Sequence, residues 1–160
     1  MDVRLCRPAG VLAIVLTGCD GPPIPACPVT PPNASLPPDE ETASPDTLGN
    51  GDLWTVLWPD GRIVFEPGGP GKIRSDGSLA MKFPFWRGET AEGDLHVTGR
   101  RLDGAAPAMT AEIPEGYGDR GLRSSALIFP SAGCWEVTAS VGDHQLTFTT
   151  EVVVREAPDG

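Results

Sequence analysis

The chain has 160 residues, with 22 acidic and 12 basic side chains and a net charge of −10 at neutral pH. This charge argues against nucleic-acid binding, because phosphates repel an acidic surface. The chain also contains 20 glycines and 18 prolines. Gly and Pro cost about 1 and 3 kcal/mol in a helix interior, so the composition favours short strands joined by turns.

The first 18 residues have the organisation of a secretory signal peptide. Arg4 and Arg7 form a basic start, and residues 9–16 form a short apolar run. This run is too short to span a bilayer, which takes about 20 apolar residues. We therefore predict a signal peptide over residues 1–18.

The next motif is Leu16-Thr17-Gly18-Cys19. It resembles the lipobox of bacterial lipoproteins, in which Leu stands three residues before the acylated cysteine, a small or hydroxyl residue two before and Gly or Ala one before. The resemblance implies cleavage after Gly18 and a lipid on Cys19. It implies a location, the extracytoplasmic face of a bacterial membrane, and no activity.

Residues 19–47 are rich in proline and poor in large apolar side chains. Such a segment cannot build a core and prefers polyproline II, at about 3.1 Å per residue. We expect a disordered, lipidated tether, with a proline-rich ligand for a partner domain as the alternative. Asn33-Ala34-Ser35 matches a glycosylation sequon, which we interpret as a chance match.

Residues 48–156 alternate short apolar runs with turn residues and are long enough for one domain, followed by a flexible tail over 157–160. The pattern predicts strands over 53–58, 63–66, 79–86, 95–101, 109–113 and 122–129, and two more in a C-terminal hairpin. Pro59-Asp60-Gly61 is a turn sequence. It predicts that the first two strands form a hairpin.

The C-terminal pair of strands carries the clearest pattern. With Gly142-Asp143 as a two-residue turn, Val141 pairs with His144 and Trp135 with Thr150. One face of this hairpin then collects nearly all the apolar residues. The sequence therefore predicts an all-β domain.

Pro130-Ser131-Ala132-Gly133-Cys134-Trp135-Glu136-Val137, followed by a turn and Leu146-Thr147-Phe148, resembles the closing hairpin of bacterial immunoglobulin-like domains. Those hairpins often read Gly, any residue, aromatic, any residue, Val. The resemblance implies an antiparallel immunoglobulin-like β-sandwich. The hairpin is also similar to that of a group of bacterial lipoproteins ending in Gly-Cys-Trp-Glu-Val, and this likeness implies no activity.

Residues able to carry chemistry do not form a recognised motif. The candidates are two histidines, three serines and three carboxylates: His96, His144, Ser124, Ser125, Ser131, Glu112, Glu115 and Asp119. The histidines lack partners at metal-binding spacing, and the serines lack a nucleophile-elbow context. We therefore predict no catalytic residue, no metal and no cofactor.

The aromatic residues Trp54, Trp58, Phe85 and Trp86 are the stronger functional lead. They are interpreted either as core packing, which large aromatics dominate, or as a patch for a ligand or partner.

Cys27 and Cys134 are the only cysteines left once Cys6 is removed and Cys19 is acylated. In an oxidising compartment they are the only intramolecular pair. The hairpin register places Cys134 on the face opposite Trp135 or at the strand end, within reach of the tether. A bridge would pin the tether to the domain, and two free thiols are the alternative.

Two functions follow from these features. The first is a lipid-anchored, non-enzymatic interaction, sensing or structural module of the cell envelope, with the membrane and an envelope protein or glycan as partners. The second is a cell-envelope hydrolase or its carbohydrate-binding accessory domain. Convergent carboxylates in a polar cleft would favour the second.

Overall fold

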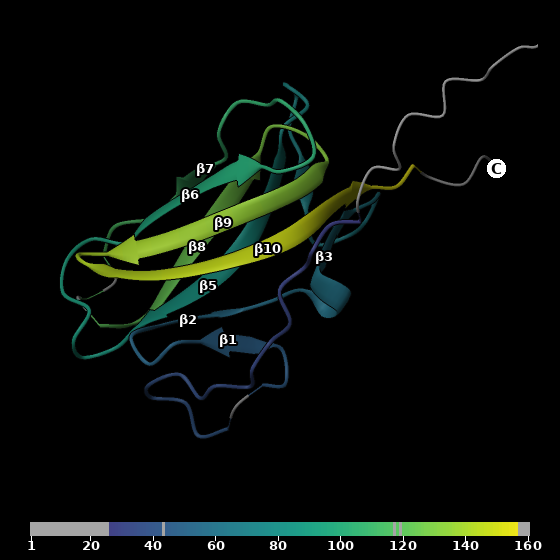
Figure 1. Cartoon of the computed structure of the whole chain (residues 1–160). Coiled ribbons are helices and arrows are strands. Elements are labelled where there is room, and N and C mark those ends of the chain that lie inside the picture. Colours follow the sequence, from purple (N-terminus) through teal and green to yellow (C-terminus); the bar gives the residue numbers. More distant parts are fainter. Residues whose placement is uncertain (1–25, 43, 117, 119, 157–160) are drawn as a thin grey trace, which may run out of the picture.

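Two β-sheets face each other and enclose the core (Figure 1). The computed structural model describes residues 26–156 except 43, 117 and 119. The predicted signal peptide, Cys19 and the predicted tail over 157–160 lie outside the described residues. The prediction of an all-β domain is confirmed for the part of the chain that is described.

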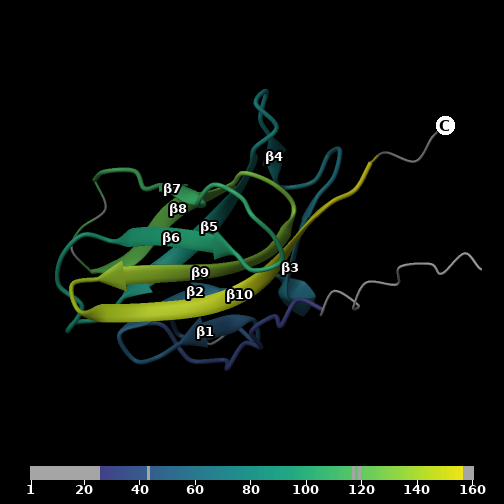
Figure 2. The ribbon, with the colours of Figure 1, turned by 45° about the horizontal axis from the view of Figure 1, so that its top comes forward.

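The first sheet has the strand order β1 (Thr47–Gly49), β2 (Leu53–Val56), β5 (Leu79–Arg87), β8 (Gly121–Phe129) and β7 (Thr110–Glu112), with β4 (Lys72–Ile73) also paired to β5. All its pairs are antiparallel. The hairpin of β4 and β5 projects from one end of the molecule (Figure 2).

The second sheet has the order β3 (Arg62–Phe65), β10 (His144–Val154), β9 (Gly133–Val141) and β6 (His96–Arg101). Here β3 runs parallel to β10, and the other pairs are antiparallel. A single 3-10 turn, η1 (Pro59–Gly61), leads into β3.

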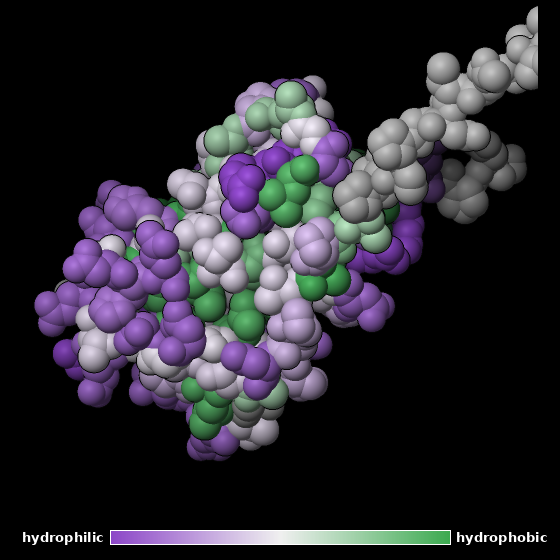
Figure 3. Space-filling model, in the orientation of Figure 1, coloured by the Kyte–Doolittle hydropathy of each residue, from purple (hydrophilic) through white to green (hydrophobic). Residues whose placement is uncertain are grey.

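The core lies between the sheets because alternate residues of each strand point inward. In β5 these are Leu79, Met81, Phe83 and Phe85. The facing sheet contributes Phe148, whose ring lies 5.8 Å from that of Phe83, centroid to centroid. The exposed face of the second sheet is mostly hydrophilic or neutral, with apolar residues in scattered groups (Figure 3).

The predicted register of the C-terminal hairpin is confirmed. His144 is paired with Val141, and Thr150 with Trp135. Trp135 and Val137 are fully buried. The Gly142-Asp143 turn and the period of two therefore suffice to fix this register.

The predicted hairpin across Pro59-Asp60-Gly61 is wrong. β2 belongs to the first sheet and β3 to the second, so the turn carries the chain from one sheet to the other. The last residues of β10, Glu151–Val154, pair with β3, and the final two of them, Val153 and Val154, extend beyond the pairing with β9. Ile63 and Phe65 are thereby fully buried in the core.

Candidate interaction site

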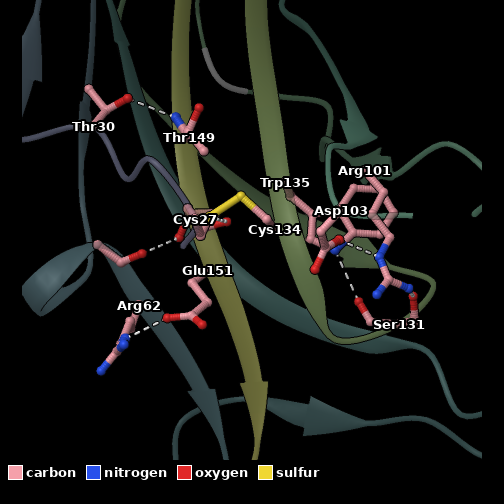
Figure 4. Close-up of a disulfide and its surroundings, with 12 residues drawn as sticks. Cys27, Thr30, Arg62, Arg101, Asp103, Ser131, Cys134, Trp135, Thr149 and Glu151 are labelled. Carbon is pink, nitrogen blue, oxygen red and sulfur yellow. Dashed lines mark hydrogen bonds and ion pairs between the residues drawn. A yellow bond between two sulfur atoms is a disulfide. The ribbon is translucent and has the colours of Figure 1, made fainter. Parts of the chain in front are cut away.

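A disulfide joins Cys27 to Cys134 and ties the start of the described chain to β9 (Figure 4). The Cα atoms of the two cysteines are 5.4 Å apart, although 107 residues separate them in sequence. Cys134 alternates with the core residue Trp135, so its side chain leaves β9 on the outer face of the second sheet. The bridge therefore lies outside the core.

The residues after Cys27 follow the sandwich. Residues 26–37 are called the N-terminal arm below. The backbone N–H of Thr30 donates to the carbonyl of Thr149, and the N–H of Thr149 donates to Oγ1 of Thr30, at 2.9 and 2.8 Å. Val29 packs so closely on Gly61 that a Cβ at residue 61 would lie 2.5 Å from the Val29 Cβ. The folded unit therefore begins well before the expected boundary at residue 48.

Asn33 pairs with the edge strand β1. Its Nδ2 donates to the carbonyl of Gly49 at 2.7 Å, and its Oδ1 accepts from the Gly49 N–H at 3.0 Å. The backbone N–H groups of Asn33 and Ala34 both donate to the carbonyl of Thr47. The side-chain amide thus replaces a neighbouring strand at an otherwise open sheet edge. The sequon asparagine has a structural role.

Trp54 lies under the same arm. Its Nε1 donates to Oγ of Ser35 at 2.9 Å, and its ring covers Gly49, where a Cβ would lie only 2.0 Å from Trp54 Cδ1. Across the sheet Trp54 is paired with Trp86, which is paired in turn with Leu122. Both indoles are buried, whereas Leu122 is 46% exposed. The two tryptophans therefore share the outer face of the first sheet.

The four predicted aromatic residues do not form one patch. Phe85 is fully buried in the core, because it alternates with Trp86 along β5 and points to the opposite face. Trp58 lies apart from Trp54 and Trp86, half-buried next to η1. A shared patch of Trp54, Trp58, Phe85 and Trp86 is therefore a wrong prediction. Trp54 and Trp86 form one group, and Trp58 stands by itself.

Arg101 braces the turn before β9, close to the disulfide (Figure 4). Its Nε donates to Oδ1 of Asp103 at 2.6 Å, and its Nη1 donates to Oγ of Ser131 at 3.2 Å. The hydrogen bond from Arg101 lowers the pKa of Asp103. Gly133 is required beneath this side chain, since its φ is +145° and a Cβ would lie 2.5 Å from Arg101 Nε.

Asp52 joins three turns at one end of the sandwich. Oδ1 of Asp52 accepts from Oγ1 of Thr90 at 2.6 Å, and its Oδ2 lies 3.1 Å from Nδ1 of His144. The hydrogen bond from Thr90 is the main cause of a lowered Asp52 pKa, and His144 adds to it. Because β10 begins at His144 and β2 follows Asp52, this contact links the two sheets.

The other candidates for chemistry do not converge. Glu112 forms an ion pair with Arg74 at 2.8 Å, and Oγ of Ser125 donates to the carbonyl of Phe83. Glu115 and His96 line a hollow with Arg123. Asp119 lies outside the described residues. Within the described ranges, no group of three His, Cys, Asp or Glu side chains is placed to hold a metal ion.

Two buried arginines were missed by sequence reasoning. Arg87 is 1% exposed and donates through Nη1 to the carbonyl of Gly93 at 2.6 Å and through Nη2 to that of Gly118. Arg123 is 8% exposed and donates to the carbonyl of Pro114 at 3.1 Å. The period-two pattern along β5 would have placed Arg87 on the inner face. Both side chains hold loops over one end of the sandwich.

Comparisons of the chain with protein-family models, with curated proteins and with solved structures found no match. Among the described residues, no helix is long and apolar enough to cross a membrane. The sites above therefore rest on the geometry of this chain. They define a sandwich whose N-terminal arm is bonded to it both covalently and through hydrogen bonds.

Proposed function

We propose that the chain is a lipid-anchored, extracytoplasmic immunoglobulin-like β-sandwich that acts as a non-enzymatic interaction, sensing or structural module of the cell envelope. The lipobox resemblance around Cys19 supplies the anchor, and the signal-like residues before it supply the export route. The membrane is thus one partner, through the lipid. An envelope protein or glycan is the other.

The strand order supports the immunoglobulin-like class. In constant-type immunoglobulin domains one sheet has the order A-B-E-D, and the other contains C, F and G. The order β2-β5-β8-β7 corresponds to the first, and β6-β9-β10 corresponds to C-F-G. Strand β3 adds a parallel edge next to β10.

The observation that carries the proposal is the Cys27–Cys134 disulfide. Disulfides persist in oxidising, extracytoplasmic compartments and are rare in the cytosol. Cys27 stands only eight residues after Cys19, and fully extended residues span at most about 3.5 Å each. A lipid on Cys19 would therefore hold the sandwich within roughly 30 Å of the bilayer surface.

The contacts of the candidate catalytic side chains support a non-enzymatic role. Ser125 and Ser131 bond within the fold, to Phe83 and Arg101, and Glu112 is paired with Arg74. These contacts tie strands and turns together. They favour a binding surface over a reaction centre.

Cys19→Ala tests the anchor, because the thioether to lipid needs the thiol. We expect the wild-type chain to incorporate labelled fatty acid and to sediment with membranes, whereas the variant incorporates none and is found in the soluble envelope fraction. Cys27→Ser is the matched control, since it replaces a cysteine of the disulfide but leaves Cys19. Membrane retention of Cys19→Ala after signal cleavage would contradict the proposal.

A further inference from the structure

A groove lies between the N-terminal arm and the turn that precedes β3. The arm contributes Val29, Thr30, Pro31 and Pro32, and the opposite side is formed by Asp46, Trp58, Asp60 and Gly61. It measures about 410 Å³. Because the disulfide and the Thr30–Thr149 hydrogen bonds hold the arm in place, the groove exists only while the arm is docked.

The charge of the groove has one sign. Among the described residues, Asp46 and Asp60 are the charged ones that line it. Within the described part of the chain, neither carboxylate takes part in an ion pair. The nearest basic residue in sequence, Arg62, is bound to Glu151 at 2.6 Å on the outer face of the second sheet. As far as the structure describes the chain, the groove therefore presents two carboxylates and no basic side chain.

Trp58 supplies the aromatic component. It is half-buried and packs against the core, so its ring is held in position while part of it stays accessible in the groove. An aromatic face attracts a cation, most strongly when the ring is an indole. Val29, Pro31 and Pro32 add apolar walls beside it.

We propose that this groove binds a lysine side chain presented by a basic segment of a partner protein. The apolar walls accommodate the four-carbon stem, as stems of lysine commonly lie along apolar surface. The indole face and the two carboxylates then receive the ammonium group. This inference rests on the proposed function in one respect, that the chain is an interaction module with a protein partner. The groove itself is part of the folded sandwich and does not depend on the lipid anchor.

The test is a titration of the full chain, in a non-ionic detergent and with ¹⁵N-labelled tryptophan, by the peptide acetyl-Gly-Lys-Gly-amide. Trp58→Phe identifies the Trp58 indole signal. We expect that signal to shift saturably, and a peptide with norleucine in place of lysine, which keeps the stem and lacks the charge, to bind at least tenfold more weakly. Raising the salt from 50 to 500 mM should weaken lysine binding severalfold.

The double variant Asp46→Asn, Asp60→Asn should bind the lysine peptide about threefold to tenfold more weakly, the range expected for exposed charge pairs. Asparagine suits residue 60 because its φ is +56°. Asp143→Asn, in the turn at the far end of β10, is the matched control and should leave binding unchanged. The other three indole signals report whether each variant is folded.

Equal affinity for the lysine and norleucine peptides, unchanged binding by the Asp46→Asn, Asp60→Asn variant, or a Trp58 signal that never moves would each overturn the proposal. Preferential binding of an uncharged chito-oligosaccharide in the same titration would also overturn it. The peptide comparison and the salt series use the unmodified chain, so they decide the matter even if the double variant does not fold. If Cys19 carries no lipid but the chain still binds the lysine peptide, the proposed lipid anchor is wrong and the proposed lysine site stands.

Discussion

Asn33 closes the free edge of β1 in place of a strand. Its amide donates to and accepts from Gly49, as a backbone peptide unit would. An open edge otherwise exposes unpaired N–H and C=O groups. The side-chain amide of this single polar residue thus forms hydrogen bonds that a neighbouring strand would otherwise form with β1.

Asn33→Ala should lower the free energy of unfolding by about 1 to 3 kcal/mol, because its two hydrogen bonds to Gly49, worth roughly 0.5 to 1.5 kcal/mol each, are lost. Urea unfolding followed by tryptophan fluorescence measures this change. Thr42→Ala, an exposed position beyond the arm, should change stability by less than about 0.5 kcal/mol. An Asn33→Ala variant as stable as the wild type would show that the arm does not protect β1.

Asp52 makes the free energy of unfolding depend on pH in the acidic range. Its pKa is lowered in the folded chain, first by the Thr90 hydroxyl and then by His144. A carboxylate with a lowered pKa stabilises the fold above its ordinary pKa, and this contribution disappears as the pH falls through the lowered value.

Asp52→Asn should therefore be less stable than the wild type at pH 7, and the difference should shrink as the pH falls from about 4, the ordinary pKa of Asp, through the lowered pKa of Asp52 in the folded chain. Thermal unfolding between pH 7 and pH 2.5 gives both curves. Asp143→Asn, in the turn next to His144, is the matched control. A difference that stays constant across this range would rule out ionised Asp52 as the link between the turns.

At the residue scale, the alternation of side chains along a strand determines which face of its sheet each candidate residue occupies. It places Cys134 opposite Trp135, which brings its thiol to the outer face where Cys27 lies. The same alternation separates Phe85 from Trp86, so the predicted aromatic set combined two faces. The Asn33–Gly49 contact leaves no such pattern, because it depends on how the arm folds back.

The N-terminal arm is an element held by one covalent bond and a few hydrogen bonds. The Cys27–Cys134 bridge closes a loop of 107 residues, and in the chain-entropy model a loop of about 100 residues is worth about 4 to 5 kcal/mol.

The double variant Cys27→Ser, Cys134→Ser should accordingly unfold with a free energy about 3 to 5 kcal/mol lower than that of the wild type. Residues 26–46 should also become sensitive to proteases under conditions in which the sandwich stays folded. Urea unfolding and timed proteolysis with mass spectrometry measure the two effects. Equal stability together with an equally protected arm would mean that the bridge does not fix the arm.

Two turns show why some elements follow from sequence and others do not. Gly142-Asp143 joins strands of matching period, and local pairing satisfies both. Pro59-Asp60-Gly61 also looks like a hairpin turn, but β3 pairs with Glu151–Val154, about 90 residues away. Nothing near residue 60 encodes that partner. The short strands β1 and β4 were missed for the same reason, since their partners rather than their own residues define them.

At the scale of the whole molecule, the folded unit comprises the arm and the sandwich. A fragment of residues 26–156 should give a strand-type circular dichroism spectrum and a cooperative unfolding transition. A fragment of residues 48–156 should be clearly less stable, because it lacks the disulfide, Asn33 and the cover over Trp54. Equal midpoints of unfolding for the two fragments would instead indicate that the folded domain begins at residue 48.

At the largest scale, we propose that a lipid on Cys19 and the Cys27–Cys134 disulfide together hold the sandwich close to a membrane. Mass spectrometry of non-reduced peptides from the protein purified from native envelopes tests this claim most directly. We predict that the mature chain begins at Cys19, that Cys19 carries the lipid, and that the peptide containing Cys27 is joined to the one containing Cys134. An unmodified Cys19, or alkylatable thiols at both Cys27 and Cys134, would contradict it.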